Sequence, residues 1–160
     1  MLTVRYNHKL KKTEITATVI SKSRIEWIQD VRKLMSDYIS QSYVLKEIVN
    51  SIFNGYFISN KTKQKYYHEY YKLLKYRDLL LLYISDSKEH KEIVKLIECL
   101  HEKTMFNLSE RNLSKEKKEN YHKNQREAAE KLRVEARDYF KNLWEEAKIE
   151  TELNKKFSNK

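Results

Sequence analysis

The strongest hydrophobic pattern in the chain lies over residues 21–40, SKSRIEWIQDVRKLMSDYIS. Its side chains form two adjacent rows at spacings of three and four residues, which is the spacing of an α-helix with a wide buried face. One row holds Ile25, Ile28, Arg32, Met35 and Ile39, and the other holds Trp27, Val31, Leu34 and Tyr38. The apolar pattern continues to Phe53, and Asn54-Gly55 predicts the end of the helix.

Three more segments have helical spacing. A second helix is predicted from Asn60 or Thr62 to Ile84, and a third ends near residues 105–108. The last begins after Ser114, a typical N-cap residue, and reaches about residue 152. The predicted buried face of the second helix holds Tyr66, Tyr70, Leu73, Arg77, Leu80 and Ile84. Residues 79–83 are apolar on every side, so we expect this end of the second helix to be the most deeply buried.

The two ends of the chain carry weaker patterns. Residues 1–12, where Leu2, Val4 and Tyr6 alternate with polar residues, favour a short strand or an extended arm. Residues 154–160 should fray, which leaves residues 13–153 as the folded domain. The predicted fold class is all-α: a single-domain antiparallel bundle of three to four helices, similar to a coiled coil, with long first and last helices.

Composition supports this fold and excludes several kinds of site. The 160 residues include no proline and one glycine, so little interrupts long helices, and one glycine cannot build a glycine-rich phosphate loop. The single cysteine, Cys99, excludes an intramolecular disulfide and a zinc site made of cysteines. No run of about 18 apolar residues predicts a membrane-spanning helix. The five histidines form no metal-binding spacing, and we expect them on solvated helix surfaces. We therefore predict a non-enzymatic protein with no cofactor, no metal and no catalytic residues.

The net charge of +10 is concentrated in two places. Residues 1–24 hold six Lys or Arg against one Glu, and residues 61–78 hold six against two acids. Such patches attract phosphate in nucleic acids or anionic lipids, although excess lysine can also serve solubility alone. The first patch gives a candidate N-terminal basic surface of Lys9, Lys11, Lys12, Lys22 and Arg24.

The second patch, KTKQKYYHEYYKLLKYR at residues 61–77, mixes lysines with tyrosines. The candidate binding surface consists of Lys61, Lys63, Lys65, Tyr67, Tyr71, Lys72 and Lys75. Tyrosines could stack on bases while lysines follow phosphates, or both could lie in a lipid headgroup layer. Alternatively, Tyr66, Tyr70 and Leu73 are simply core and the lysines are solvated.

Arg32 interrupts an apolar row, and a buried arginine needs a carboxylate partner. Acids near the end of the last helix could supply one, so we predict a structural ion pair between Arg32 and Glu145. Arg77 raises the same question in the second helix. If the apolar row is narrower than drawn, Arg32 instead extends to water.

Three segments, residues 21–40, LLKYRDLLLLYISDSKEHKEIVKLI and ARDYFKNLWEEAK, resemble a group of uncharacterised helical proteins of bacteria and their mobile elements. The matching positions are Arg24, Trp27, Ile28, Arg32, His90 and Trp144-Glu145. In that group the first helix follows a transmembrane segment, so the resemblance implies a cytoplasmic helical unit at a membrane. This chain departs upstream of Ser21, where KKTEITATVI is too short and polar to span a bilayer, which puts membrane anchoring in doubt.

Together these features predict a cytoplasmic helical protein, encoded by a phage or plasmid, that acts by binding a protein partner. Two alternatives stay open: a basic helical nucleic-acid-binding protein and a protein associated with an anionic membrane surface. Helix packing could also produce a homo-oligomer.

Overall fold

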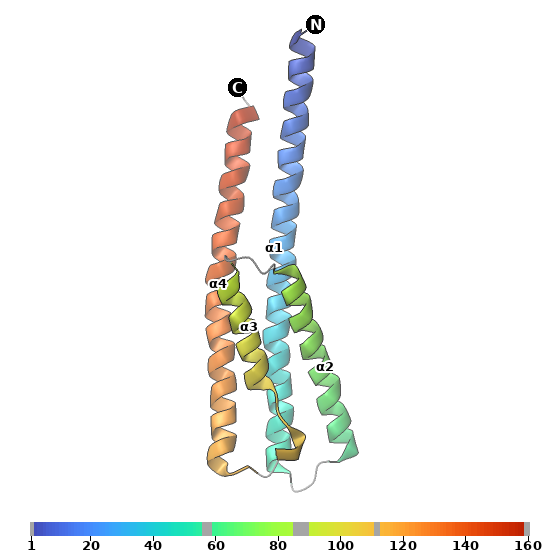
Figure 1. Ribbon diagram of the computed structural model, residues 1–160, viewed down its shortest axis with the longest axis vertical. Coiled ribbons are helices and arrows are strands. Elements are labelled where there is room, and N and C mark those ends of the chain that lie inside the picture. Colours follow the sequence, from blue (N-terminus) through green and yellow to red (C-terminus); the bar gives the residue numbers. More distant parts are fainter. Residues whose placement is uncertain (1, 56–58, 85–89, 111–112, 159–160) are drawn as a thin grey trace. The chain divides into compact units, whose positions relative to one another are not determined.

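The structure is a computed structural model. It describes the backbone of residues 2–55, 59–84, 90–110 and 113–158, and the side chains of residues 19–55, 59–84, 90–109 and 113–149. In these ranges the elements are α1 (Leu2–Asn54), α2 (Asn60–Tyr83), α3 (Lys91–Thr104), the short 3₁₀ helix η1 (Leu108–Glu110) and α4 (Lys115–Ser158) (Figure 1). They include no strand, so the predicted all-α class is confirmed.

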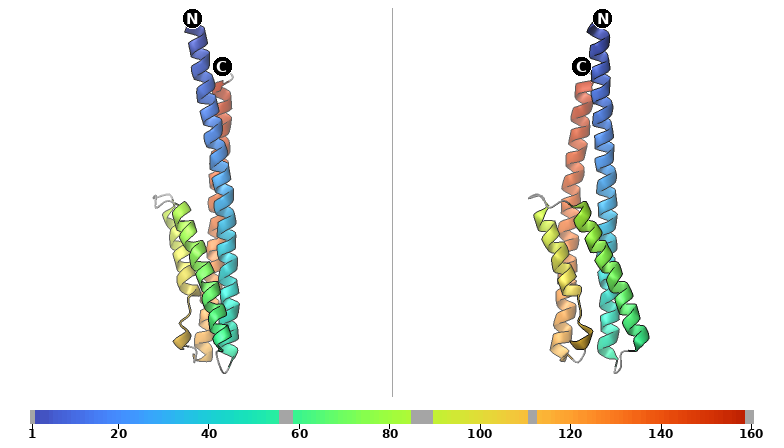
Figure 2. Two further views of the ribbon diagram at one scale, coloured as in Figure 1. Left: turned by 90° about the vertical axis from the view of Figure 1, so that its right-hand side faces the viewer. Right: turned by 45° about the vertical axis from the view of Figure 1, so that its right-hand side comes forward.

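The chain divides into two compact units. The bundle unit is Lys33–Arg137, and the terminal unit is Met1–Arg32 with Asp138–Lys160. Helices α1 and α4 contribute residues to both units, whereas α2 and α3 belong to the bundle unit. Successive helices of the bundle unit run in opposite directions, and α2 lies beside α3 in every view (Figure 2). The structure thus has two compact units where the sequence predicted one domain over residues 13–153.

The core of the bundle unit comes from all four of its helices. Its fully buried side chains include Tyr38, Leu45, Leu73, Leu80, Ile97, Leu100 and Leu132. Burying one leucine of this kind stabilises the fold by roughly 1.5–3 kcal/mol, because its apolar surface leaves water. Two tyrosines add cross-links between segments: Tyr38 Oη donates to Ile97 O at 2.9 Å, and Tyr66 Oη donates to Phe106 O at 2.7 Å. Burial raises the pKa of both hydroxyls, which therefore stay protonated donors.

Helix α2 is held to the bundle by a narrow row of side chains. Tyr66, Leu73 and Leu80 are seven residues apart and all buried, with half-buried Tyr70 and Arg77 between them. This alternation of four- and three-residue steps is the seam of a coiled coil. The predicted inner face of α2 is therefore confirmed, and its limits, Asn60–Tyr83, agree with the predicted ones to within one residue. Six further residues of α2 are half-buried and the rest are exposed, which leaves the outer side of the helix available to solvent.

Several local predictions were wrong. Helix α1 begins at Leu2, so residues 2–12 are not an extended arm, and α4 continues to Ser158, so the tail is helical over most of residues 154–160. A lone strand leaves its backbone groups unpaired, whereas a helix pairs them internally, and neither segment contains proline or glycine to prevent it. At the end of α2, Leu80 is buried, but Leu82 is 81% and Tyr83 46% exposed. The apolar run at residues 79–83 is therefore not the most buried part of the helix.

Replacing Leu73 with alanine should lower the free energy of unfolding by about 2–5 kcal/mol, because it opens a cavity in the seam. The matched control is Leu82→Ala on the same helix, where the side chain is 81% exposed and the change should stay within about 0.5 kcal/mol. Urea unfolding followed by circular dichroism measures both. Equal losses for the two variants would contradict this account of the seam.

Candidate binding surface on α2

Helix α2 is a regular scaffold whose ends are fixed. The Oγ atom of Ser59 accepts the backbone N–H of Thr62 at 3.1 Å, and at the other end Ile84 N donates to Leu80 O at 2.8 Å. A side-chain cap of this kind stabilises a helix by about 1 kcal/mol. Residues 60–83 contain no proline or glycine, so the positions along α2 follow regular helical spacing.

All seven residues of the predicted binding surface are exposed on α2. Lys61, Lys65, Lys72 and Lys75 lie in one row with His68, at alternating steps of four and three residues. We call these five residues the cation row. At 1.5 Å per residue the row extends about 21 Å, with one basic side chain roughly every 5 Å. Lys63 is exposed outside this row, on the other side of Tyr67.

The cation row carries charge that the protein itself largely leaves unneutralised. Within the described ranges, no carboxylate forms an ion pair with Lys61, Lys63, Lys65 or Lys75. Other helices differ: α4 pairs Lys115 with Glu119 at 3.8 Å and Lys148 with Glu145 at 3.3 Å, and α3 pairs Lys95 with Glu92 at 3.5 Å. The net positive potential of the bundle unit should therefore be strongest along α2.

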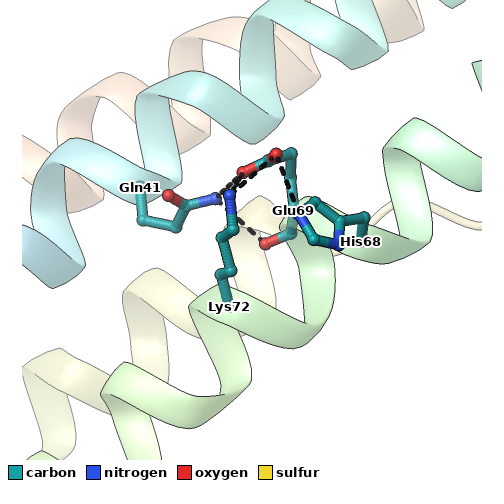
Figure 3. A network of polar contacts seen from close by, with 4 residues as sticks. All are labelled: Gln41, His68, Glu69 and Lys72. Atoms are coloured by element: carbon teal, nitrogen blue, oxygen red, sulfur yellow. Dashed lines mark hydrogen bonds and ion pairs between the residues drawn. The ribbon is translucent and has the colours of Figure 1, made fainter.

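Lys72 is the exception, because it belongs to a polar network that joins α2 to α1 (Figure 3). Its Nζ lies 3.1 Å and 3.2 Å from the two carboxylate oxygens of Glu69. From α1, Gln41 Nε2 donates to Glu69 Oε2 at 2.8 Å and to the backbone oxygen of Glu69 at 3.0 Å. His68 Nε2 lies 3.8 Å from Glu69 Oε1. The hydrogen bond from Gln41, and then Lys72, lower the pKa of Glu69, so this carboxylate stays ionised.

Two tyrosines, Tyr67 and Tyr71, are 47% and 62% exposed on the outer side of α2, next to the cation row. We call them the tyrosine pair. The ring of Tyr67 meets buried Tyr66 edge-on at 5.5 Å, and the ring of Tyr71 lies 5.4 Å from that of half-buried Tyr70. Tyr66 and Tyr70 are parallel at 6.4 Å. The exposed rings are therefore supported by rings that the bundle itself holds in place.

The predicted N-terminal basic surface falls in the terminal unit. The side chains of Lys9, Lys11 and Lys12 lie outside the described residues. Lys22 forms an ion pair with Glu26 at 3.9 Å, and Arg24 Nη2 donates to Glu146 Oε2 at 2.9 Å. The two described members of this surface are thus partly neutralised, unlike most of the cation row.

The predicted ion pair between Arg32 and Glu145 was wrong. Arg32 is exposed, and Glu145 pairs with Lys148. The apolar row is narrower than the sequence suggested, so Arg32 extends to water. On α1 it is Arg24 that contacts an acid of α4, namely Glu146. Half-buried Arg77 does have a partner, since its Nε lies 3.1 Å from Glu98 Oε2 on α3.

Of the five histidines, His68, His90, His101 and His122 have described side chains. His101 is buried and His122 half-buried, so the expectation that all histidines lie on the surface was wrong. Burial first, and then the positive charges of Arg77 and Lys46 respectively, lower their pKa values. Among the described residues no three His, Cys, Asp or Glu side chains are placed to hold a metal ion. A shallow hollow along α4, lined by Arg126, Glu127, Glu130, Lys131, Val134 and Glu135, combines both signs of charge.

Sequence reasoning missed the contacts that position this surface. Gln41 and Glu69 lie near the edge of the apolar pattern on their helices, and helical spacing alone does not show that they meet. Helix α1 is continuous through residues 40–42, where Ser42 Oγ donates to Ile39 O at 2.7 Å.

Comparison of the chain with protein-family models, with curated proteins and with solved structures gives no match. Over the residues described, none of the helices combines the length and the apolar character needed to cross a membrane. The surface of α2 is therefore the feature of the described residues that bears on function.

Replacing Gln41 with alanine should lower the free energy of unfolding at pH 7 by about 1–3 kcal/mol, because a charged acceptor loses its donor. The pKa of Glu69 is depressed in the folded protein, so this stabilisation is present above its unfolded value of 4.5 and is lost as pH falls through the folded pKa. The cost of the substitution should therefore shrink in acid. Urea unfolding at pH 7 and near pH 3 checks this, with exposed Gln64→Ala as control. A cost independent of pH would contradict the assignment.

Proposed function

We propose that the protein is a non-enzymatic helical binding module that holds an anionic ligand on the outer face of α2. One observation carries the proposal: the cation row is a line of basic side chains with little internal neutralisation beside two exposed, supported tyrosine rings. An anionic ligand would gain Coulomb energy along the row and displace bound counterions. It would also cover aromatic surface that now faces water.

The matched comparison is between two triple variants with the same net charge. Lys61→Gln, Lys65→Gln and Lys75→Gln remove cations from the row, whereas Lys115→Gln, Lys117→Gln and Lys123→Gln remove exposed cations from α4. With inorganic polyphosphate as probe, the α2 variant should bind about tenfold more weakly at about 50 mM salt, with a shallower salt dependence. The α4 variant should bind nearly as tightly as the unmodified protein. Equal losses in the two variants would mean that only total charge matters.

A protein partner with an acidic surface is the second candidate, and the end of α2 favours it. Leu82 and Tyr83 expose apolar surface beyond Lys75, and large exposed side chains of this kind anchor protein interfaces. Leu82→Ser should weaken binding of a protein partner while leaving polyphosphate binding unchanged. Loss of polyphosphate binding in that variant would show that the two ends of α2 do not act separately.

A further inference from the structure

On the basis of the proposed function, the arrangement of the cation row and the tyrosine pair indicates which class of anionic ligand α2 binds. We propose that the outer face of α2 binds single-stranded nucleic acid, with phosphates along the cation row and bases against Tyr67 and Tyr71. The positive charge of the cation row is complementary to the phosphates of the strand. The tyrosine rings match its bases, and a simple polyanion would not use these rings.

The cation row and the tyrosine pair run side by side along one helix. Tyr71 lies three residues after His68 and four residues before Lys75, spacings at which side chains of a helix are neighbours, and Tyr67 lies four residues after Lys63. Nucleic acid strands have the same division, with a charged edge of phosphates and an edge of bases with flat π faces. Proteins that bind single strands combine lysines that follow the backbone with aromatic rings that stack on bases.

The spacing favours a single strand over a duplex. Tyr67 and Tyr71 are four residues apart, which separates them by about 6 Å along the helix axis. Bases stacked in a duplex are about 3.4 Å apart and expose only their edges to a protein. An unstacked strand can instead open its bases to match the rings. The cation row extends about 21 Å along the helix axis. About six phosphates span this length at about 3.4 Å per nucleotide, and fewer span it in an extended strand.

The support behind the rings also favours base stacking. Tyr66 is buried, its hydroxyl donates to Phe106 O at 2.7 Å, and its ring meets that of Tyr67 at 5.5 Å. Tyr70, which lies parallel to Tyr66, contacts the ring of Tyr71. A ring held in this way loses little freedom when a base stacks on it, so less of the binding energy is spent on ordering. An acidic protein surface would match the lysines equally but has no need of two supported ring faces.

The test measures anisotropy of a labelled oligothymidylate of about 12 nucleotides at low salt. The double variant Tyr67→Leu with Tyr71→Leu keeps apolar side chains but removes both π faces, and should weaken binding by about tenfold for each ring. Tyr139→Leu is the matched control, because Tyr139 is a half-buried tyrosine of α4 rather than α2, and this variant should bind as the unmodified protein does. The logarithm of the binding constant should fall with the logarithm of salt concentration with a slope of about −2 to −3, from three or four phosphate contacts.

Other probes distinguish failure of the single-strand proposal from failure of the proposed binding of an anionic ligand. Inorganic polyphosphate should bind equally to the unmodified protein and the tyrosine double variant. If oligothymidylate also binds both equally, base stacking is excluded while the anionic-ligand function stands. If neither probe binds at low salt, both proposals fail. Tighter binding to a duplex of the same length, to vesicles containing an anionic lipid or to an acidic helical peptide would also overturn the single-strand assignment.

Discussion

The structure of the candidate surface depends on the narrow seam of α2. Only side chains at seven-residue intervals, Tyr66, Leu73 and Leu80, are fully buried on this helix, with Tyr70 and Arg77 half-buried between them. A helix that buried a wider face would also turn Tyr67, Tyr71 or lysines of the cation row inward. Because the seam is narrow, one side of α2 can carry a complete row of cations and a complete pair of rings. The seam residues therefore determine which side chains of α2 form the candidate surface, although no seam residue is part of that surface.

A row of like charges on one helix lowers the stability of the fold, and this loss of stability bears on the function of the row. Lys61 and Lys65 are four residues apart, and Lys72 and Lys75 three apart, and like-charge neighbours at these spacings destabilise a helix by roughly 0.2–0.5 kcal/mol per pair. Helix α4 avoids this by placing acids at the same spacings, as in Lys115 with Glu119. The chain therefore has acids available and uses them elsewhere. A charged row kept at a cost in stability is better explained by an external anion than by solubility, for which mixed charge serves equally well.

Helical periodicity predicted what depends on neighbours within one helix, and it failed where the outcome depends on another segment. The limits of α2, its inner row and the exposure of all seven surface residues follow from spacing alone. Spacing could not show which side of the apolar run at residues 79–83 meets the bundle, so exposed Leu82 was expected inside. For the same reason Arg32 was predicted to pair with Glu145, whereas it is Arg24 that contacts an acid of α4, Glu146. Residues 2–12 were assigned too little helix, because alternation of the kind shown by Leu2, Val4 and Tyr6 produces a stable strand only where a partner strand is present.

The contact of Gln41 with Glu69 shows how a carboxylate can lie within a cationic surface without neutralising it. Glu69 is largely turned away from solvent, with 14% of its side chain exposed, and it accepts hydrogen bonds from α1 as well as from Lys72. Its charge therefore stabilises the attachment of α2 to α1 and fixes the ammonium group of Lys72, the fourth of the five residues of the row. Lys72 is half-exposed, so its outer side still faces an approaching anion. A cation that is already positioned loses less side-chain entropy on binding than a free lysine does. Glu69, which contacts the cation row at His68 and Lys72, thus supports anion binding, because it orders Lys72 while Lys61, Lys65 and Lys75 form no ion pair with a described carboxylate.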